Sequence, residues 1–230
     1  MKSIVRTLIF VISCFMYFGC GPSNKLSGIS EGKIIYKVEF PKSENKSQLI
    51  GIMPDEVEMN FKNNNTAMNI KGFAGSFGIS FITDKENNKY YSLVRIIADR
   101  FKHVTDSNDI AFGYDMIKDM EITREKDTAT ICGFLCHKAT AHCKNINRDL
   151  ELWYTTDIKI SRPNINNAFR DLDGVLMKFQ VILSGIYMEF TAKEISDEEI
   201  PDETFLIPEN YEEIQKDSLE RFLKSFDPDL

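Results

Sequence analysis

The chain has 230 residues, of which 28 are basic and 35 acidic, giving a formal net charge of −7. This negative balance argues against nucleic acid as a partner, because phosphate backbones attract basic surfaces. Hydrophobic residues make up 43% of the chain and include 17 Phe and 8 Tyr, enough to fill a sizeable core. The composition therefore excludes disorder for the bulk of the chain and predicts one large domain or two small ones.

The first twenty residues have the organisation of an export signal. Lys2 and Arg6 precede an apolar run of 11 residues, 8–18, which ends at a small-residue junction. A helix that crosses a bilayer needs about 20 apolar residues, so the run is too short for a permanent transmembrane anchor. We expect residues 1–19 to be removed as a signal peptide.

The junction contains a cysteine, Cys20, and resembles the lipobox of bacterial lipoproteins. The resemblance implies that the Cys20 thiol carries the lipid and that residues 20–30 form an anchor and tether. Cys14 is the alternative lipidation site, and an ordinary secretory signal without lipid is a further alternative. Lipidation would place the protein in the bacterial cell envelope, bound to the outer membrane through its lipid and facing the periplasm.

From residue 31 onward the dominant pattern is the alternation of apolar and polar residues that is typical of half-buried strands. Turn-forming residues such as the asparagines at 63–65 and the pair Ser184-Gly185 separate successive runs. The predicted strands cover residues 32–40, 57–62, 66–71, 77–81, 90–97, 100–105, 122–125, 128–132, 135–145, 150–155, 175–183 and 186–192.

Helical patterns are few. The clearest follows Asn210, a predicted N-cap with Glu213 as its capping-box partner, and ends at Pro228. A second, shorter helix is expected over 109–120, and a single helical turn over 167–171. The predicted fold is thus mainly β (α+β): one domain, residues 31–226, in which a curled antiparallel sheet forms a half-barrel with covering helices, including the C-terminal one. A two-sheet sandwich is the alternative architecture.

Three cysteines remain in the predicted domain: Cys132, Cys136 and Cys143. Cys132 and Cys136 could face each other across a hairpin turn and form a disulfide; the alternative is that all three are small buried hydrophobic residues. A metal site is not expected, since Cys136 and His142 would lie about 20 Å apart along an extended strand. No known catalytic motif or cofactor-binding motif occurs, so we expect no enzyme and no cofactor.

Large apolar side chains occupy one face of several predicted strands. They either fill an ordinary core or line a cavity for a hydrophobic ligand. The candidate cavity residues are Phe61, Phe77, Phe81, Met177, Phe179, Met188 and Phe190.

Four short blocks, residues 131–139, 152–158, 174–179 and 200–211, resemble envelope lipoproteins of the Bacteroidetes type. The resemblance is to a domain family of unknown function related to the GLPGLI proteins and to the lipoprotein-carrier half-barrel. It implies a concave apolar face that holds acyl chains, and it supplies no catalytic residues. The sequence therefore predicts a lipid-anchored periplasmic protein, attached to the membrane by its N-terminal lipid, that binds a hydrophobic or acyl ligand. The alternative is a structural or protein-interaction module of the envelope.

Overall fold

The structure, a computed structural model, describes residues 28–72, 75 and 77–226. The predicted signal peptide and the predicted lipidation site, Cys20, lie outside these residues and stay predictions. No helix among the described residues is long and apolar enough to span a membrane.

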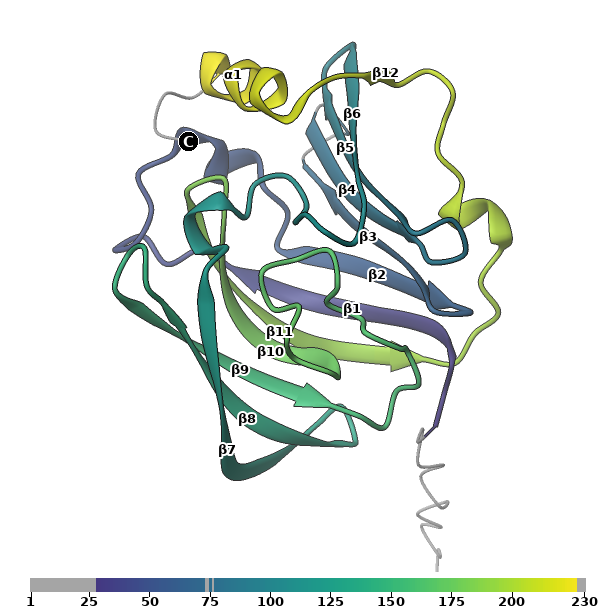
Figure 1. Cartoon of the computed structure of the whole chain (residues 1–230), viewed down its shortest axis with the longest axis vertical. Coiled ribbons are helices and arrows are strands. Elements are labelled where there is room, and N and C mark those ends of the chain that lie inside the picture. Colours follow the sequence, from purple (N-terminus) through teal and green to yellow (C-terminus); the bar gives the residue numbers. More distant parts are fainter. Residues whose placement is uncertain (1–27, 73–74, 76, 227–230) are drawn as a thin grey trace, which may run out of the picture.

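One sheet of twelve strands forms the body of the protein (Figure 1). All neighbouring strands are antiparallel except the pair at one edge, where β12 runs parallel to β6. In order across the sheet, the strands are β12 (Glu212–Glu213), β6 (Asp99–Thr105), β5 (Lys89–Ile96), β4 (Phe77–Asp84), β3 (Asn65–Lys71), β2 (Glu56–Lys62), β1 (Glu31–Glu39), β11 (Ile186–Ser196), β10 (Val175–Leu183), β9 (Arg148–Thr155), β8 (Phe134–Cys143) and β7 (Met120–Ile131).

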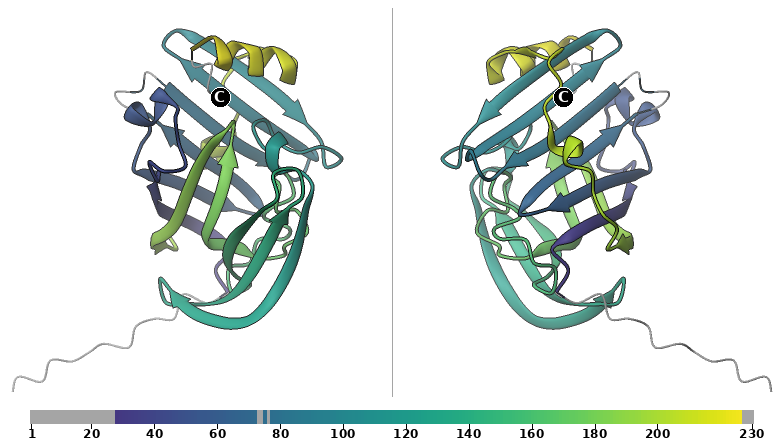
Figure 2. Two further views of the ribbon diagram at one scale, coloured as in Figure 1. Left: turned by 90° about the vertical axis from the view of Figure 1, so that its left-hand side faces the viewer. Right: turned by 90° about the vertical axis from the view of Figure 1, so that its right-hand side faces the viewer.

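The sheet is open and strongly curled, so that its two halves bend toward one another (Figures 1 and 2). A sheet of this many strands accumulates twist and cannot stay flat. Its concave face carries most of the core, as the alternating burial of Ile34, Tyr36 and Val38 on β1 illustrates. The prediction of a mainly β, curled antiparallel sheet is therefore confirmed.

Two-residue hairpin turns join several neighbouring strands. Both turn residues have positive φ in these loops, the conformation whose twist matches that of the flanking strands. The residues concerned are Asn63 and Asn64, Cys132 and Gly133, and Ser184 and Gly185.

The predicted covering helices are barely present. The helices described are three short 3₁₀ segments, η1 (Gln48–Ile52), η3 (Asp115–Ile117) and η4 (Asp202–Phe205), and one α-helix, α1 (Lys216–Phe226). Two irregular segments cover the concave face instead, residues 106–119 and 156–174, which we call the first and second inner segments. The helix expected over 109–120 is thus reduced to η3, and the helical turn expected over 167–171 is reduced to a hydrogen-bonded turn in which the Leu172 amide donates to the Phe169 carbonyl at 2.9 Å.

Hydrogen bonds to the sheet hold the inner segments in irregular conformations. The Ala111 amide donates to the Asn166 carbonyl at 2.7 Å and so joins the two segments. The Phe112 backbone amide donates to Ser92 Oγ on β5, and the side-chain amide of Asn166 donates to Thr83 Oγ1 on β4, both at 3.3 Å. The bonds from Ala111 and Phe112 satisfy backbone groups that would otherwise bond within a helix.

The C-terminal part of the chain starts on the opposite, convex face. A small second cluster of Ala67, Ile82 and Leu93 lies there, covered by Phe205, Ile207 and Tyr211. The chain then pairs through β12 with the edge strand β6 and continues into α1, which lies across one end of the curled sheet (Figures 1 and 2). The helix begins six residues after the predicted cap, Asn210, because this intervening stretch bonds to the sheet edge.

Candidate functional site

A cavity of about 60 Å³ lies between the concave face and the two inner segments. We call it the inner cavity. The sheet contributes side chains from β1 to β4, β10 and β11, and the segments contribute Ala111, Tyr114 and Phe169, among others. Its lining is mostly apolar, and six aromatic side chains take part: Tyr36, Phe81, Tyr114, Phe169, Phe179 and Phe190.

Three of these rings form a packed wall at the centre of the sheet. Phe179 and Phe190 lie opposite each other on β10 and β11 and stack with centroids 4.7 Å apart at an interplanar angle of 7°. Tyr36 on β1 meets both rings edge-on, at 5.8 and 6.0 Å. Such edge-to-face and stacked contacts add stability beyond burial alone.

Polar groups at the inner cavity mostly serve the fold. The buried Asn164 amide donates to the carbonyls of Leu172 and Gly174, at 2.8 and 2.9 Å, and so pins the second inner segment. Burial raises the pKa of both Tyr36 and Tyr114 above the usual value of 10, which keeps these hydroxyls neutral. The cavity is therefore suited to an uncharged, apolar group.

Of the seven residues predicted to line a cavity, four do so: Phe81, Phe179, Met188 and Phe190. Phe61 and Met177 are fully buried but belong to the surrounding core. Met177 is displaced because the register between β9 and β10 shifts between Leu176 and Lys178, which places Leu176 at the cavity instead. Phe77 lines a separate hollow near α1.

Sequence patterns missed the contributions of the inner segments. Tyr114 and Phe169 line the cavity, but neither lies in a strand with a regular period that would predict its direction. Tyr36 shares the alternation of β1 with Ile34 and Val38, so its inward direction could have been read from the sequence.

Two further hollows lie beside α1. The hollow under α1, about 20 Å³, shares Ile70, Leu183 and Met188 with the inner cavity and is closed by Leu223 of the helix. The second, about 150 Å³, opens at the surface between α1 and the first inner segment, and we call it the outer hollow.

The outer hollow contains a pair of carboxylates, Asp115 and Glu220. Asp115 Oδ1 pairs with Lys216 Nζ of α1 at 2.7 Å, whereas the buried Oδ2 has no hydrogen-bond partner among the described residues. Desolvation, and the nearby Asp115 charge, raise the pKa of Glu220. A protonated Glu220 can donate to Asp115 and so help to hold the helix in place.

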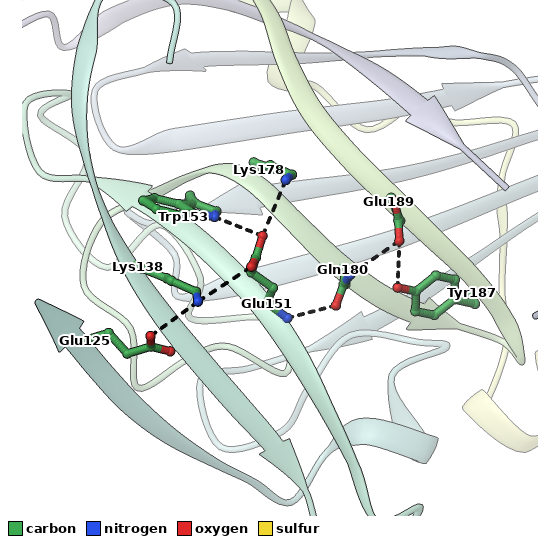
Figure 3. A network of polar contacts seen from close by, with 8 residues as sticks. All are labelled: Glu125, Lys138, Glu151, Trp153, Lys178, Gln180, Tyr187 and Glu189. Atoms are coloured by element: carbon green, nitrogen blue, oxygen red, sulfur yellow. Dashed lines mark hydrogen bonds and ion pairs between the residues drawn. The ribbon is translucent and has the colours of Figure 1, made fainter. Parts of the chain in front are cut away.

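A polar network crosses the convex face of β7 to β11 (Figure 3). Glu151 accepts hydrogen bonds from Trp153 Nε1 at 3.0 Å and Lys178 Nζ at 3.4 Å, and Lys138 bridges it to Glu125. The Trp153 hydrogen bond is the main cause that lowers the pKa of Glu151. The Thr140 hydroxyl likewise lowers the pKa of Glu125.

Because both carboxylates are ionised and partnered, neither can act as a proton donor near neutral pH. The network continues through Gln180, which accepts from the Glu151 amide at 2.9 Å and reaches Glu189 at 3.3 Å. We interpret it as a set of cross-strand contacts that fixes the register of β8 to β11.

The three cysteines of the domain are free thiols. The bridge considered between Cys132 and Cys136 is not formed, because the hairpin turn consists of Cys132 and Gly133 alone. Ala129, and not Cys132, therefore lies opposite Cys136. Burial raises the pKa of Cys136 to about 11, so its reactive thiolate is scarce at neutral pH. Among the described residues, no group of three or more His, Cys, Asp or Glu side chains could hold a metal ion.

A protein-family model described as N-glycanase peptide, N-terminal domain, matches residues 42–165. No curated protein matches the chain. The family match shows that the predicted kinship with the GLPGLI proteins and the lipoprotein-carrier half-barrel is wrong. That prediction depended on four sequence blocks, which are too short and degenerate to identify a family. The expectation that the protein is no enzyme is also overturned, because the matching family takes its name from an N-glycanase.

Among solved structures, the "Structure of PNGF-II in C2 space group" superposes with a TM-score of 0.55 and 16% sequence identity. The alignment covers 84% of this chain and 32% of that chain, so the present chain spans about a third of the solved protein. At this identity the likeness shows the fold alone. The family model, however, matches more than half of the 230 residues, and the chain therefore belongs to the family of PNGase F-II N-terminal domains.

Proposed function

We propose that this domain binds a ligand with an apolar chain or ring in the inner cavity. The observation that supports the proposal is the cavity itself, which is lined by six aromatic side chains and by aliphatic side chains such as Ile70 and Val181. Concave sites lined by apolar and aromatic residues, with few polar groups, are typical of small-molecule sites.

The size of the cavity limits what enters without rearrangement. Its volume of about 60 Å³ is well below the ~150 Å³ of an engineered protein cavity that holds benzene. We therefore propose that the end of an acyl chain or a small ring enters first. Each buried methylene would contribute about 0.8 kcal/mol, so a four-carbon segment would gain about 3 kcal/mol.

The predicted export signal and the lipid on Cys20 would place this binding activity in the cell envelope, with the membrane as its source of apolar ligands. In this proposal the concave face is used as in a half-barrel, although inner segments and not helices cover it.

The binding proposal can be tested with the full-length protein and N-phenyl-1-naphthylamine, an uncharged apolar probe that fluoresces when bound. Met68 lines the cavity from a partly exposed position, so Met68→Trp should fill the space without overpacking the core. We expect saturable probe binding to the wild type, displacement by lauric acid, and at least about tenfold weaker binding to Met68→Trp, equivalent to about 1.4 kcal/mol.

Leu135→Trp is the matched control, because the substitution adds the same indole away from the cavity. Leu135 is half exposed and lies near the β7–β8 turn. A lack of saturable binding by the wild type would exclude the proposal. So would equal weakening by both tryptophan variants.

The family match favours a second function, a part in N-glycanase action on glycoproteins. We expect the protein to release the glycan from a synthetic glycopeptide that carries a single N-linked glycan. Mass spectrometry of the peptide before and after incubation measures this release. A glycopeptide whose mass is unchanged, at enzyme concentrations that equal the substrate, would overturn the second function and leave the ligand-binding proposal standing.

A further inference from the structure

The inner cavity, the hollow under α1 and the outer hollow lie next to one another. The first two share Ile70, Leu183 and Met188, and the second and third share Ser184 and Leu223. Leu223 of α1, which is buried, lines both the hollow under α1 and the outer hollow. The three hollows thus lie in a row that begins at the cavity, passes beneath the helix and ends at the outer hollow.

Among the described residues, helix α1 contacts the body through a small apolar face and through a partly buried ion pair. Leu219 and Leu223 are buried, and Phe222 packs edge-on against Phe101 of β6 with centroids 4.7 Å apart. The ion pair joins Lys216, at the first position of the helix, to Asp115. An element with few attachments opens at a lower free-energy cost than the strands beneath it.

The first inner segment connects this attachment directly to the cavity. Tyr114 lines the inner cavity, where its ring packs against that of Phe81 at 5.9 Å. The next residue, Asp115, lines the outer hollow and binds Lys216. A movement of Tyr114 that makes room for a ligand would therefore shift the carboxylate that holds the helix.

We infer that α1 is the gate of the inner cavity and that the Lys216–Asp115 pair is its latch. The inference rests on the proposed ligand binding and specifies how that site is entered. Ligand passes through the outer hollow and the hollow under α1 when the helix lifts, and the latch sets how often it lifts. Closure then excludes water from the apolar site, as lids do in other proteins.

The gate is tested by measuring the association rate of N-phenyl-1-naphthylamine with the full-length protein in a stopped-flow fluorimeter. Lys216→Met keeps most of the unbranched side chain and removes the latch. We expect about fivefold faster association. This factor corresponds to ~1 kcal/mol, the upper end of the range of free energies that exposed ion pairs contribute. Raising the salt concentration should speed association by the wild type but not by Lys216→Met, since screening weakens the same pair.

Lys144→Met is the matched control, because it removes an exposed ion pair with Glu121 at 3.3 Å, from residues that line none of the three hollows. Met116→Trp tests the path in the opposite direction: Met116 is 44% exposed and lines the outer hollow, so its replacement should slow association without disturbing the core. Circular dichroism would verify that each variant is folded.

Rates that are equal in the wild type, Lys216→Met and Met116→Trp would overturn the gate while the binding proposal stands. An equal acceleration by Lys144→Met would likewise overturn it. Absence of saturable probe binding to the wild type would overturn both proposals, since the gate depends on a cavity that binds.

Discussion

Tyr36 occupies the centre of the molecule and links three strands through one side chain. Its ring packs edge-on against Phe179 and Phe190, and its hydroxyl donates to the Leu176 carbonyl on β10 at 2.8 Å. Leu176 lies at the β9–β10 irregularity, where the regular ladder is interrupted. The Tyr36 hydroxyl therefore satisfies a carbonyl next to the interruption that places Leu176 at the cavity.

Replacement of Tyr36 by Phe should destabilise the protein by about 1–2 kcal/mol, since it leaves the buried Leu176 carbonyl without its donor while the packing is kept. Urea unfolding followed by circular dichroism measures the change. The control is Tyr91→Phe in the small second cluster on the convex face, where Tyr91 is partly buried, and we expect a loss of less than about 0.5 kcal/mol. Equal losses in the two variants would contradict this role of the Tyr36 hydroxyl.

The first inner segment shows how tertiary contacts override a helical pattern. Ile110, Tyr114 and Ile117 are all buried, as the predicted helix over 109–120 would require. The backbone nevertheless bonds to the second inner segment and to Ser92. In addition, the Gly113 carbonyl accepts from the Ser184 amide of the β10–β11 turn. Only one short 3₁₀ turn therefore forms in this segment. Apolar spacing identified which side chains would be buried, whereas the backbone path depended on partners distant in the sequence.

The C-terminal helix illustrates the same competition at an element boundary. Asn210 and Glu213 have the spacing of a capping box, yet Glu212 and Glu213 pair with Phe101 and Lys102 of β6. An exposed sheet edge offers unpaired backbone groups, which the passing chain satisfies before the helix begins. Leu219 and Leu223 of the helix are buried in the core, and Phe222 packs against it.

The Asp115–Glu220 pair should make the attachment of α1 depend on pH. Asp115 faces Glu220 from η3 and raises the pKa of Glu220. On α1, the Asp217 charge also raises this pKa and the Lys216 charge lowers it, and Lys224 lines the same hollow. Since the pKa of Glu220 is raised above its ordinary value of 4.5, the folded state binds this proton more tightly than the unfolded state. Its contribution to stability is thus fully present below pH 4.5 and is lost as the pH rises through the folded pKa.

We expect probe association with the wild type to become faster as the pH rises through this range. Glu220→Gln keeps a hydrogen-bond donor beside Asp115 but cannot titrate, so its association rate should not change over the same range. Association rates measured from pH 4.5 to 8 for both proteins provide the test. An identical pH profile in the two proteins would exclude Glu220 as the titrating group.

At the scale of the whole molecule, the sheet is one continuous surface from β12 to β7, whose middle strands come from both ends of the chain. β1 lies between β2 and β11, so the first strand pairs with a strand more than 140 residues later. Hairpins that neighbour each other in sequence could be predicted from turns and alternation. The β1–β11 pairing could not, because local patterns carry no information about which distant strand closes the sheet.

The amino-acid sequence by itself determined the mainly β class, most strand positions and the apolar character of the concave face. Alternation and turn chemistry act over a few residues, so these features are encoded locally. The tertiary structure decided which apolar residues line the cavity: it moved Met177 into the core, brought Tyr114 and Phe169 to the site, and kept Cys132 away from Cys136. Each of these outcomes depends on register shifts and on contacts between segments that are distant along the chain. A local sequence pattern does not contain the free energies of such contacts and so cannot predict them.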